Sequence, residues 1–231
     1  MKKLLFIIPA LFFQTMQAQQ KEPLKFNDKG EFKIVQFTDV HFKYKNPASD
    51  VALECIDRVL DAEKPELVIF TGDVVYNSPA DTAMITVLSH VSKRNIPFVV
   101  TLGNHDDEQN LTREQLYNVA RSVKGNIQPD NQTDFVLRVN SKDKEDALLY
   151  VFDSHSYSKL PNVKGYDWIK ASQIEWYRQL SKKETSANNN KPLPALAFFH
   201  IPLPEYAEAA STQSSILSCL LYTSPSPRDC S

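Results

Sequence analysis

The chain contains 231 residues, of which 42% are hydrophobic, and carries a formal net charge of −2 at pH 7. A chain of this length is long enough for one domain with a hydrophobic core. A mildly acidic composition lacks the basic surface of a general nucleic-acid-binding protein, so we expect no nucleic-acid partner.

Residues 1–18 have the pattern of a secretory signal peptide. Lys2 and Lys3 precede an apolar run from Leu4 to Phe13, and small and polar residues follow up to Ala18. An apolar run of about ten residues is shorter than the roughly 20 needed to span a bilayer, which argues against the alternative, an uncleaved anchor. We therefore predict a secreted or periplasmic protein with no membrane anchor after cleavage. Residues 19–31 form a polar N-terminal segment.

Residues 219–231 do not continue the pattern of the chain before them. They show no apolar period and resemble the translation of a sequencing adapter. We predict that this tail is artefactual and that the natural sequence ends near Ser218; the alternative is a disordered tail rich in serine and proline. Of the three cysteines, only Cys55 then remains, and we expect it to be buried on a helix face.

Short apolar segments predict three strands in the first half of the chain, at 34–37, 67–70 and 98–100. Helical patterns separate these strands. Ser49 or Asp50 can cap the first helix, and Pro65 stops it. The second helix ends before Pro97.

The capping-box pattern of Thr112 and Gln115 predicts a third helix, and Gly125 suits its C-terminal end. The remaining predicted elements are, in chain order, strands at 135–139 and 148–152, a helix from Ser172 to about Lys182 opened by Ser172 with Glu175, a surface loop at 184–191 and a strand at 195–199. This β-α-β-α-β start predicts an α/β fold with a partly parallel sheet, in a single domain.

Polar motifs follow the predicted strands at the points where the strands end: Asp39-Val40-His41, Gly72-Asp73, Gly103-Asn104-His105-Asp106 and His200. In open α/β sheets, ligands bind beyond the carboxyl ends of the strands, so we expect these residues to meet in one crevice. Glycine before Asp73 and before Asn104 permits a sharp turn and a close approach to an ion or a phosphate.

The donor types in these motifs favour a metal site. Oxygen ligands from Asp and Asn, mixed with imidazole, suit Mn, Zn or Fe, and a carboxylate can bridge two metal ions. An Asp-x-His motif alone is weak, since it occurs by chance in roughly one chain in five. Gly-Asn-His-Asp is much rarer, and the ordered set, each motif at a strand end, is a strong signal.

In this order, the motifs resemble those of calcineurin-like metallophosphoesterases. Residues 32–42 and 194–206 are most similar to the purple acid phosphatase-like branch, and the resemblance covers about 32–206. It implies a metallophosphoesterase-type β-sandwich flanked by helices over residues 32–218, incomplete at its C-terminal end. It also implies hydrolysis of a phosphate monoester or diester by a water activated between two metal ions.

The resemblance implies a role for each ligand residue. Asp39 and His41 would bind the first metal ion, Asp73 would bridge both ions, and Asn104 and His200 would bind the second. The family closes its site with a Gly-His-x-His motif, which does not follow His200 here. Both ions would then lack one protein ligand, so the chain as written is expected to be inactive. The alternative is a non-catalytic module that binds a ligand or a partner.

Two catalytic residues are implied as well. His105 would lie near the phosphate and stabilise charge or protonate the leaving group, and Asp106 would orient it. Tyr76 is open to two interpretations: a packing or pocket residue, which we favour because His41 is present, or a ligand to ferric iron. His155 either lines the substrate pocket or has a structural role.

Overall fold

The computed structural model describes residues 23–142, 146–203 and 205–206. The predicted signal peptide at 1–18 and the predicted tail at 219–231 lie outside the described residues. Among the described residues, no helix combines the length and the hydropathy that spanning a membrane requires.

The first sheet is parallel, with the strand order β1-β2-β3. Its strands are β1 (Ile34–Phe37), β2 (Leu67–Thr71) and β3 (Phe98–Thr101), and its helices are α1 (Pro47–Glu63), α2 (Ala80–Ser92) and α3 (Arg113–Ser122), with a short 3-10 turn at Asp106–Glu108. α1 and α2 connect consecutive parallel strands, as the predicted β-α-β-α-β start requires. All three strands therefore end at the same edge of the sheet.

The second sheet has the order β4-β5-β6. It contains β4 (Phe135–Val139), β5 (Ala147–Val151) and β6 (Ala195–Phe198), and α4 (Ala171–Ala187) connects the last two strands. β4 and β5 are antiparallel, whereas β5 and β6 are parallel. β6 lies at the edge of this sheet, with Leu196 56% exposed, and among the described strands it pairs only with β5.

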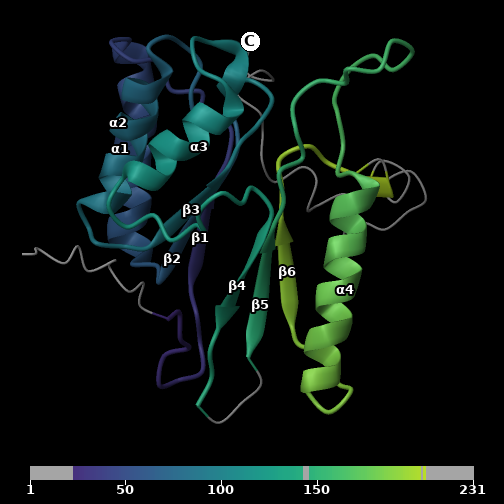
Figure 1. The fold of residues 1–231 in the computed structure, drawn as a ribbon. Coiled ribbons are helices and arrows are strands. Elements are labelled where there is room, and N and C mark those ends of the chain that lie inside the picture. The colour runs from purple at the N-terminus through teal and green to yellow at the C-terminus, as the bar shows by residue number, and fades with distance from the viewer. Residues whose placement is uncertain (1–22, 143–145, 204, 207–231) are drawn as a thin grey trace, which may run out of the picture.

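The two sheets pack face to face between helices. The core that they share comprises Leu67, Ile69, Val99, Phe135, Val139, Leu149, Val151 and Phe198. Side chains alternate along a strand, so Val68 and Phe70 point the other way and pack with α1, α2 and α3. Figure 1 shows these helices on one side of the molecule and α4 on the other. The predicted β-sandwich flanked by helices is therefore confirmed.

α1 begins three or four residues earlier than the predicted cap at Ser49 or Asp50 implies. Asn46 is its N-cap, and the side-chain oxygen of Asn46 accepts a hydrogen bond of 3.0 Å from the N–H of Ala48. Pro47, which has no N–H to satisfy, occupies the first turn. The prediction for Cys55 was also wrong: Cys55 is exposed, because Ile56 and Leu60 form the buried stripe of this helix.

The capping box of α3 is confirmed, whereas that of α4 lies elsewhere. The Thr112 side chain accepts from the N–H of Gln115, and the Gln115 side chain accepts from the N–H of Thr112. In α4, the Gln173 side chain accepts from the N–H of Lys170, so the helix opens before Ser172. α4 also continues to Ala187, into the predicted loop at 184–191.

Gly125 is likewise not the C-cap of α3. The helix ends at Ser122 with Val123 as its C-cap. Gly125 follows with φ 94°, and its carbonyl accepts from the N–H of Phe98 at 3.0 Å. The positive φ of Gly125, which few other residues adopt, therefore lets the chain turn back after α3 and pair with β3.

Replacement of the α1 cap tests this account of the helix start. Asn46→Ala should lower the free energy of unfolding by about 1 kcal/mol, because the N–H of Ala48 loses its acceptor. Asp50→Ala is the control, since an exposed first-turn carboxylate acts only through the helix dipole, which salt screens. Denaturant unfolding at high salt measures both variants. A loss in Asp50→Ala as large as that in Asn46→Ala would contradict the assignment of Asn46 as the N-cap.

Candidate metal centre

The ends of β1 and β2 are joined beyond the sheet by backbone hydrogen bonds. The N–H of Asp39 donates to the carbonyl of Gly72 at 3.1 Å, and the N–H of His41 donates to the carbonyl of Asp73 at 2.8 Å. His200, two residues after β6, approaches from the other sheet, and its Nδ1 donates to the carbonyl of Thr71 at 2.8 Å. Residues far apart in the chain thus meet at one edge, as predicted.

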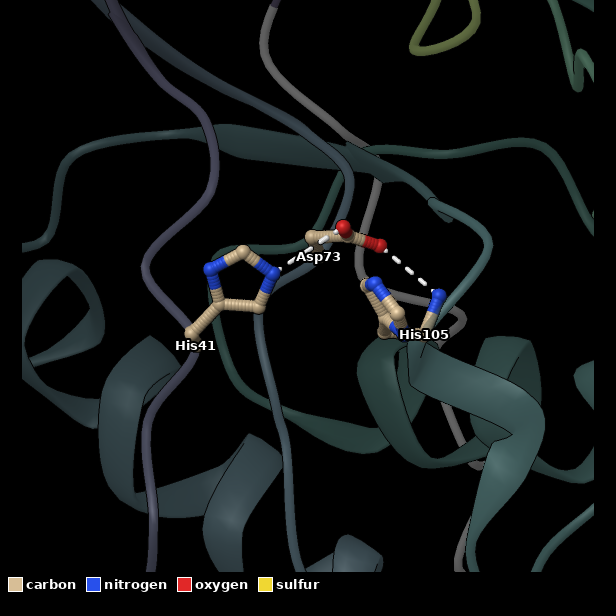
Figure 2. Close-up of side chains that lie close together, drawn as sticks. All are labelled: His41, Asp73 and His105. Carbon is tan, nitrogen blue, oxygen red and sulfur yellow. Dashed lines mark hydrogen bonds and ion pairs between the residues drawn. The ribbon is translucent and has the colours of Figure 1, made fainter. Parts of the chain in front are cut away.

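Asp73 lies at the centre of this group, only 2% exposed. Its Oδ2 is 3.1 Å from Nε2 of His41 and 3.4 Å from Nε2 of His200. Its Oδ1 accepts a 2.8 Å hydrogen bond from the backbone N–H of His105. Figure 2 shows His41 and His105 on opposite sides of the carboxylate. One carboxylate therefore faces donor groups from three other segments of the chain.

The two imidazoles govern the ionisation of Asp73. Burial would raise the pKa of Asp73, but hydrogen bonds from His200 and His41 outweigh burial and lower the pKa well below its usual range. Burial in turn would lower the pKa of His200, and the Asp73 carboxylate raises that pKa above its usual value. A proton on His200 and a metal cation both balance the charge of Asp73, so the two compete for this place.

Hydrogen bonding also fixes a proton on Nδ1 of His200, whether or not Nε2 is protonated. A carbonyl oxygen only accepts, so Nδ1 of His200 carries the proton that it donates to Thr71. Nε2 is left facing Oδ2 of Asp73 and Oδ1 of Asn104, the latter at 3.2 Å. An imidazole fixed in this way by a carbonyl is oriented as a metal ligand.

Within the part of the chain that the structure describes, the donor atoms form two groups that share Asp73. Asp39, Asp73 and His200 each offer an atom within 4.8 Å of the others, and so do His41, Asp73 and His105. This division differs from the one implied by resemblance, which pairs Asp39 with His41. It also brings His105 among the candidate ligands. Carboxylate, imidazole and amide oxygen donors converging around one shared carboxylate fit a pair of transition-metal cations.

Asp106 is fully buried and organises the backbone beneath these ligands. Its Oδ1 accepts from the N–H groups of Val74 and Val75, and its Oδ2 accepts from those of Asp73 and Gly103, all at 2.8–2.9 Å. Burial raises the pKa of Asp106, while these backbone donors act to lower it. Asp106, which the resemblance expects to orient His105, thus positions the two loops, and it is too deeply buried to contact a substrate.

The loops are packed too tightly for a side chain at the two motif glycines. A Cβ on Gly72 would lie 2.6 Å from Nδ1 of His200 and 2.6 Å from the backbone N of Gly103. A Cβ on Gly103 would collide with the Asp73 carboxylate. Asp39, His41 and Asp73 all have positive φ, at 54°, 48° and 52°. Such strain costs on the order of 1–3 kcal/mol per residue and clusters at functional sites.

Several residues that support the site were missed by sequence reasoning. Arg113 on α3 donates to the carbonyls of Leu102 and Gly103 and pairs with Asp153 after β5, which joins the two sheets near the site. Glu108 accepts from Nδ1 of His105 at 2.7 Å. Of these residues, only Glu108 could have been predicted from the sequence, because it lies three residues after His105 and its side chain can reach back to that ring.

Ring contacts and hydrogen bonds bear on the two residues left open, Tyr76 and His155. The Tyr76 ring packs edge-on against His41 and His105, with centroids 5.2 and 5.0 Å apart, which agrees with the packing or pocket role favoured from the sequence. Nε2 of His155 lies 3.2 Å from Oε1 of Gln173. His155 is not among the residues that line the cavity at the site.

A cavity of about 350 Å³ opens over the ligands. It is lined by Asp39, Asp73, Asn104, His105, Tyr166, His200, Ile201 and Pro202. The fold and this cavity define an α/β sandwich with a candidate metal centre at the ends of its strands. The model of the calcineurin-like phosphoesterase family matches residues 32–222, and the chain belongs to this family.

Curated relatives agree with the family. The chain is 33% identical over 226 residues to "Probable inactive purple acid phosphatase 29" of Arabidopsis thaliana, covering 81% of this chain and 58% of the relative. It is 34% identical over 222 residues to "Phosphatase DCR2" of Saccharomyces cerevisiae, covering 81% of this chain and 37% of the relative. The predicted resemblance to purple acid phosphatase-like proteins is therefore confirmed, and the chain spans only part of both relatives.

A solved structure supports the fold. The crystal structure of a dimetal phosphatase from Danio rerio superposes with a TM-score of 0.54 at 13% sequence identity, covering 75% of this chain and 71% of the other. At this identity the likeness concerns the fold alone.

Substitution of Gly72 tests the close packing under the ligands. Gly72→Ala should lose metal affinity and destabilise the fold, because its Cβ would collide with Nδ1 of His200 and with backbone atoms. Gly165→Ala is a matched control, since Gly165 has the same φ of 97° but no atom within 4 Å of an added Cβ. Both variants carry about 1–2 kcal/mol of backbone strain, and overpacking adds about 1–3 kcal/mol at Gly72 alone.

Thermal unfolding and Mn²⁺ titration measure the two variants side by side. Equal metal affinity in Gly72→Ala and Gly165→Ala would show that the contact with His200 does not shape the site.

Proposed function

We propose that the protein hydrolyses phosphate esters, monoesters or diesters, with a pair of metal ions bound around Asp73. The observation that carries this proposal is the place of the Asp73 carboxylate in both donor groups, with Oδ2 near His41 and His200. Asp39 and His200 would hold one ion and His41 the other, with Asn104 beside His200. Iron, manganese and zinc all suit such donors.

Residues of the chain would hold the two cations and keep the ligands in place. Two cations bound here would lower the pKa of a water and neutralise charge on the phosphate. Asp73 and Asp39 supply the negative charge that retains cations, and the Thr71 carbonyl keeps Nε2 of His200 available. Asp106 keeps the loops of Asp73 and Gly103 at a fixed separation through its four backbone hydrogen bonds.

His105 is the proposed proton donor to the leaving group. Because a carboxylate only accepts, Nδ1 of His105 donates to Glu108, and the ring lines the cavity. This contact orients the imidazole. The competing role is that of a metal ligand beside His41, since His105 lies in that donor group. The two roles differ in what loss of the ring does to metal content.

A second candidate is a non-catalytic module that binds a ligand or a partner. The observation that favours it is the Arabidopsis thaliana relative with 33% identity, which is named a probable inactive purple acid phosphatase. The ligand residues present in this chain argue for catalysis instead, because Asp39, His41, Asp73, Asn104 and His200 all lie at one site.

We further propose that the protein acts outside the cytoplasm. The support is the signal-peptide pattern of residues 1–18, with Lys2 and Lys3 before an apolar run. N-terminal sequencing of the exported protein tests this proposal, which expects the mature chain to begin at Gln19.

Variants of His105 and Asn104 test the mechanism in protein expressed from its complete reading frame. His105→Ala should keep both metal ions and lower kcat for a chromogenic phosphate ester by about 10²–10⁴-fold, the range for loss of a general acid. Asn104→Ala should lose metal and activity together. Metal content by mass spectrometry is read beside turnover, with His90→Ala on the remote α2 as the control.

Three results would contradict this account. Undiminished turnover after chelation would exclude the metal mechanism, and metal loss in His105→Ala would make His105 a ligand. A metal-loaded protein without turnover on any phosphate ester would favour the binding module.

A further inference from the structure

A hairpin between β5 and α4 stands beside the metal site. The N–H of Ser158 donates to the carbonyl of Gly165, and the N–H of Asp167 donates to that of Ser156, both at 3.0 Å. Tyr157 and Tyr166 therefore lie directly opposite each other as an antiparallel pair. Figure 1 shows this segment, in green, projecting beyond the ends of the strands. Directly opposed residues of such a pair place their side chains on the same face.

Hydrogen bonds fix the base of the hairpin to the motif that follows β3. Nδ2 of Asn104 donates to the Tyr157 hydroxyl at 2.8 Å, and this hydroxyl donates to Oε1 of Glu108 at 2.9 Å. The Ser156 hydroxyl donates to the carbonyl of Asn104 at 3.1 Å. Since the other oxygen of Glu108 accepts from His105, the hairpin and the site residues form one connected network.

Tyr166 extends this network into the cavity. Its ring stacks on Tyr157, with centroids 5.8 Å apart and an angle of 21° between the planes. Tyr166 is nevertheless 51% exposed and lines the cavity over the ligands. Ile201 and Pro202 line the same cavity. The cavity thus has one part made of metal-binding side chains and another made of an aromatic ring and apolar groups.

This division of the cavity matches the two parts of a phosphate ester. We propose that Tyr166, supported by Tyr157, stacks on the organic group of the ester and selects substrates whose leaving group is flat and aromatic. The inference rests on the proposed function, because it takes the phosphoryl group to bind at Asp73 and His200. An aromatic ring prefers another aromatic ring over an aliphatic ring of similar size, since its quadrupole complements only the former.

Binding of two phosphonates to the Mn²⁺-loaded protein tests this selectivity without turnover. Benzylphosphonate and cyclohexylmethylphosphonate share the same acid group and the same linker, and they differ in the aromatic character of the ring. We expect calorimetry to give an affinity about fivefold higher for the benzyl compound, within the roughly two- to twelvefold range that aromatic pairs contribute.

Variants of the hairpin assign the preference to Tyr166. Tyr166→Ala should reduce the benzyl preference to no more than about twofold, below the contribution of an aromatic pair, whereas Tyr166→Phe should retain it, because the ring and not the hydroxyl makes the contact. Leu160→Ala is the matched control: Leu160 is 53% exposed on the same hairpin and is not among the residues lining the cavity. It should keep the preference of the wild type.

Orthophosphate separates failure of this inference from failure of the proposed function. If Mn²⁺-loaded wild-type protein bound neither orthophosphate nor either phosphonate, the phosphate-ester site and the inference would both be refuted. If orthophosphate bound but the two phosphonates bound equally, or if Tyr166→Ala kept the benzyl preference, only the aromatic selectivity would be refuted.

Discussion

The carboxylate of Asp106 accepts four backbone hydrogen bonds from two loops that begin at the ends of neighbouring strands. Each of these N–H groups would otherwise be buried without a partner, at a cost of about 1–3 kcal/mol. The loop after β2 and the loop after β3 are therefore fixed relative to each other before any ligand is considered. Asp73 and Asn104, one on each loop, take their separation from this contact.

The close approach of the loops explains other features of the site. It leaves no room for a side chain at Gly72 or Gly103, and it accompanies left-handed backbone at Asp39, His41 and Asp73. A strained backbone persists only where its surroundings over-determine it, and here two sheets, Arg113 and the buried Asp106 carboxylate do so. The result is a preorganised set of donors around one carboxylate, which suits cations that require closely defined ligand positions.

The sequence allowed much of this arrangement to be predicted, for a simple reason. Parallel strands end at one edge, so motifs after consecutive strands must meet, as Asp39 and Asp73 do. Local hydrogen-bonding patterns could also be predicted from the sequence, as in the capping box of Thr112. The role of Asp106 and the position of Tyr166 could not be predicted from the sequence, because each depends on contacts between loops whose separation is set by the whole fold. The exposure of Cys55 was mispredicted since several rotations of an apolar helix stripe are compatible with its pattern.

The central claim is that Asp73 lies between two metal ions. Crystals of the protein soaked in Mn²⁺ and measured for anomalous scattering test it most directly, because each ion gives its own peak. The account predicts two peaks about 3.5–4 Å apart, the spacing of two-metal hydrolases. One peak should lie beside Asp39 and His200 and the other beside His41, with the Asp73 carboxylate in contact with both. A single peak, or two peaks of which only one contacts Asp73, would contradict the account.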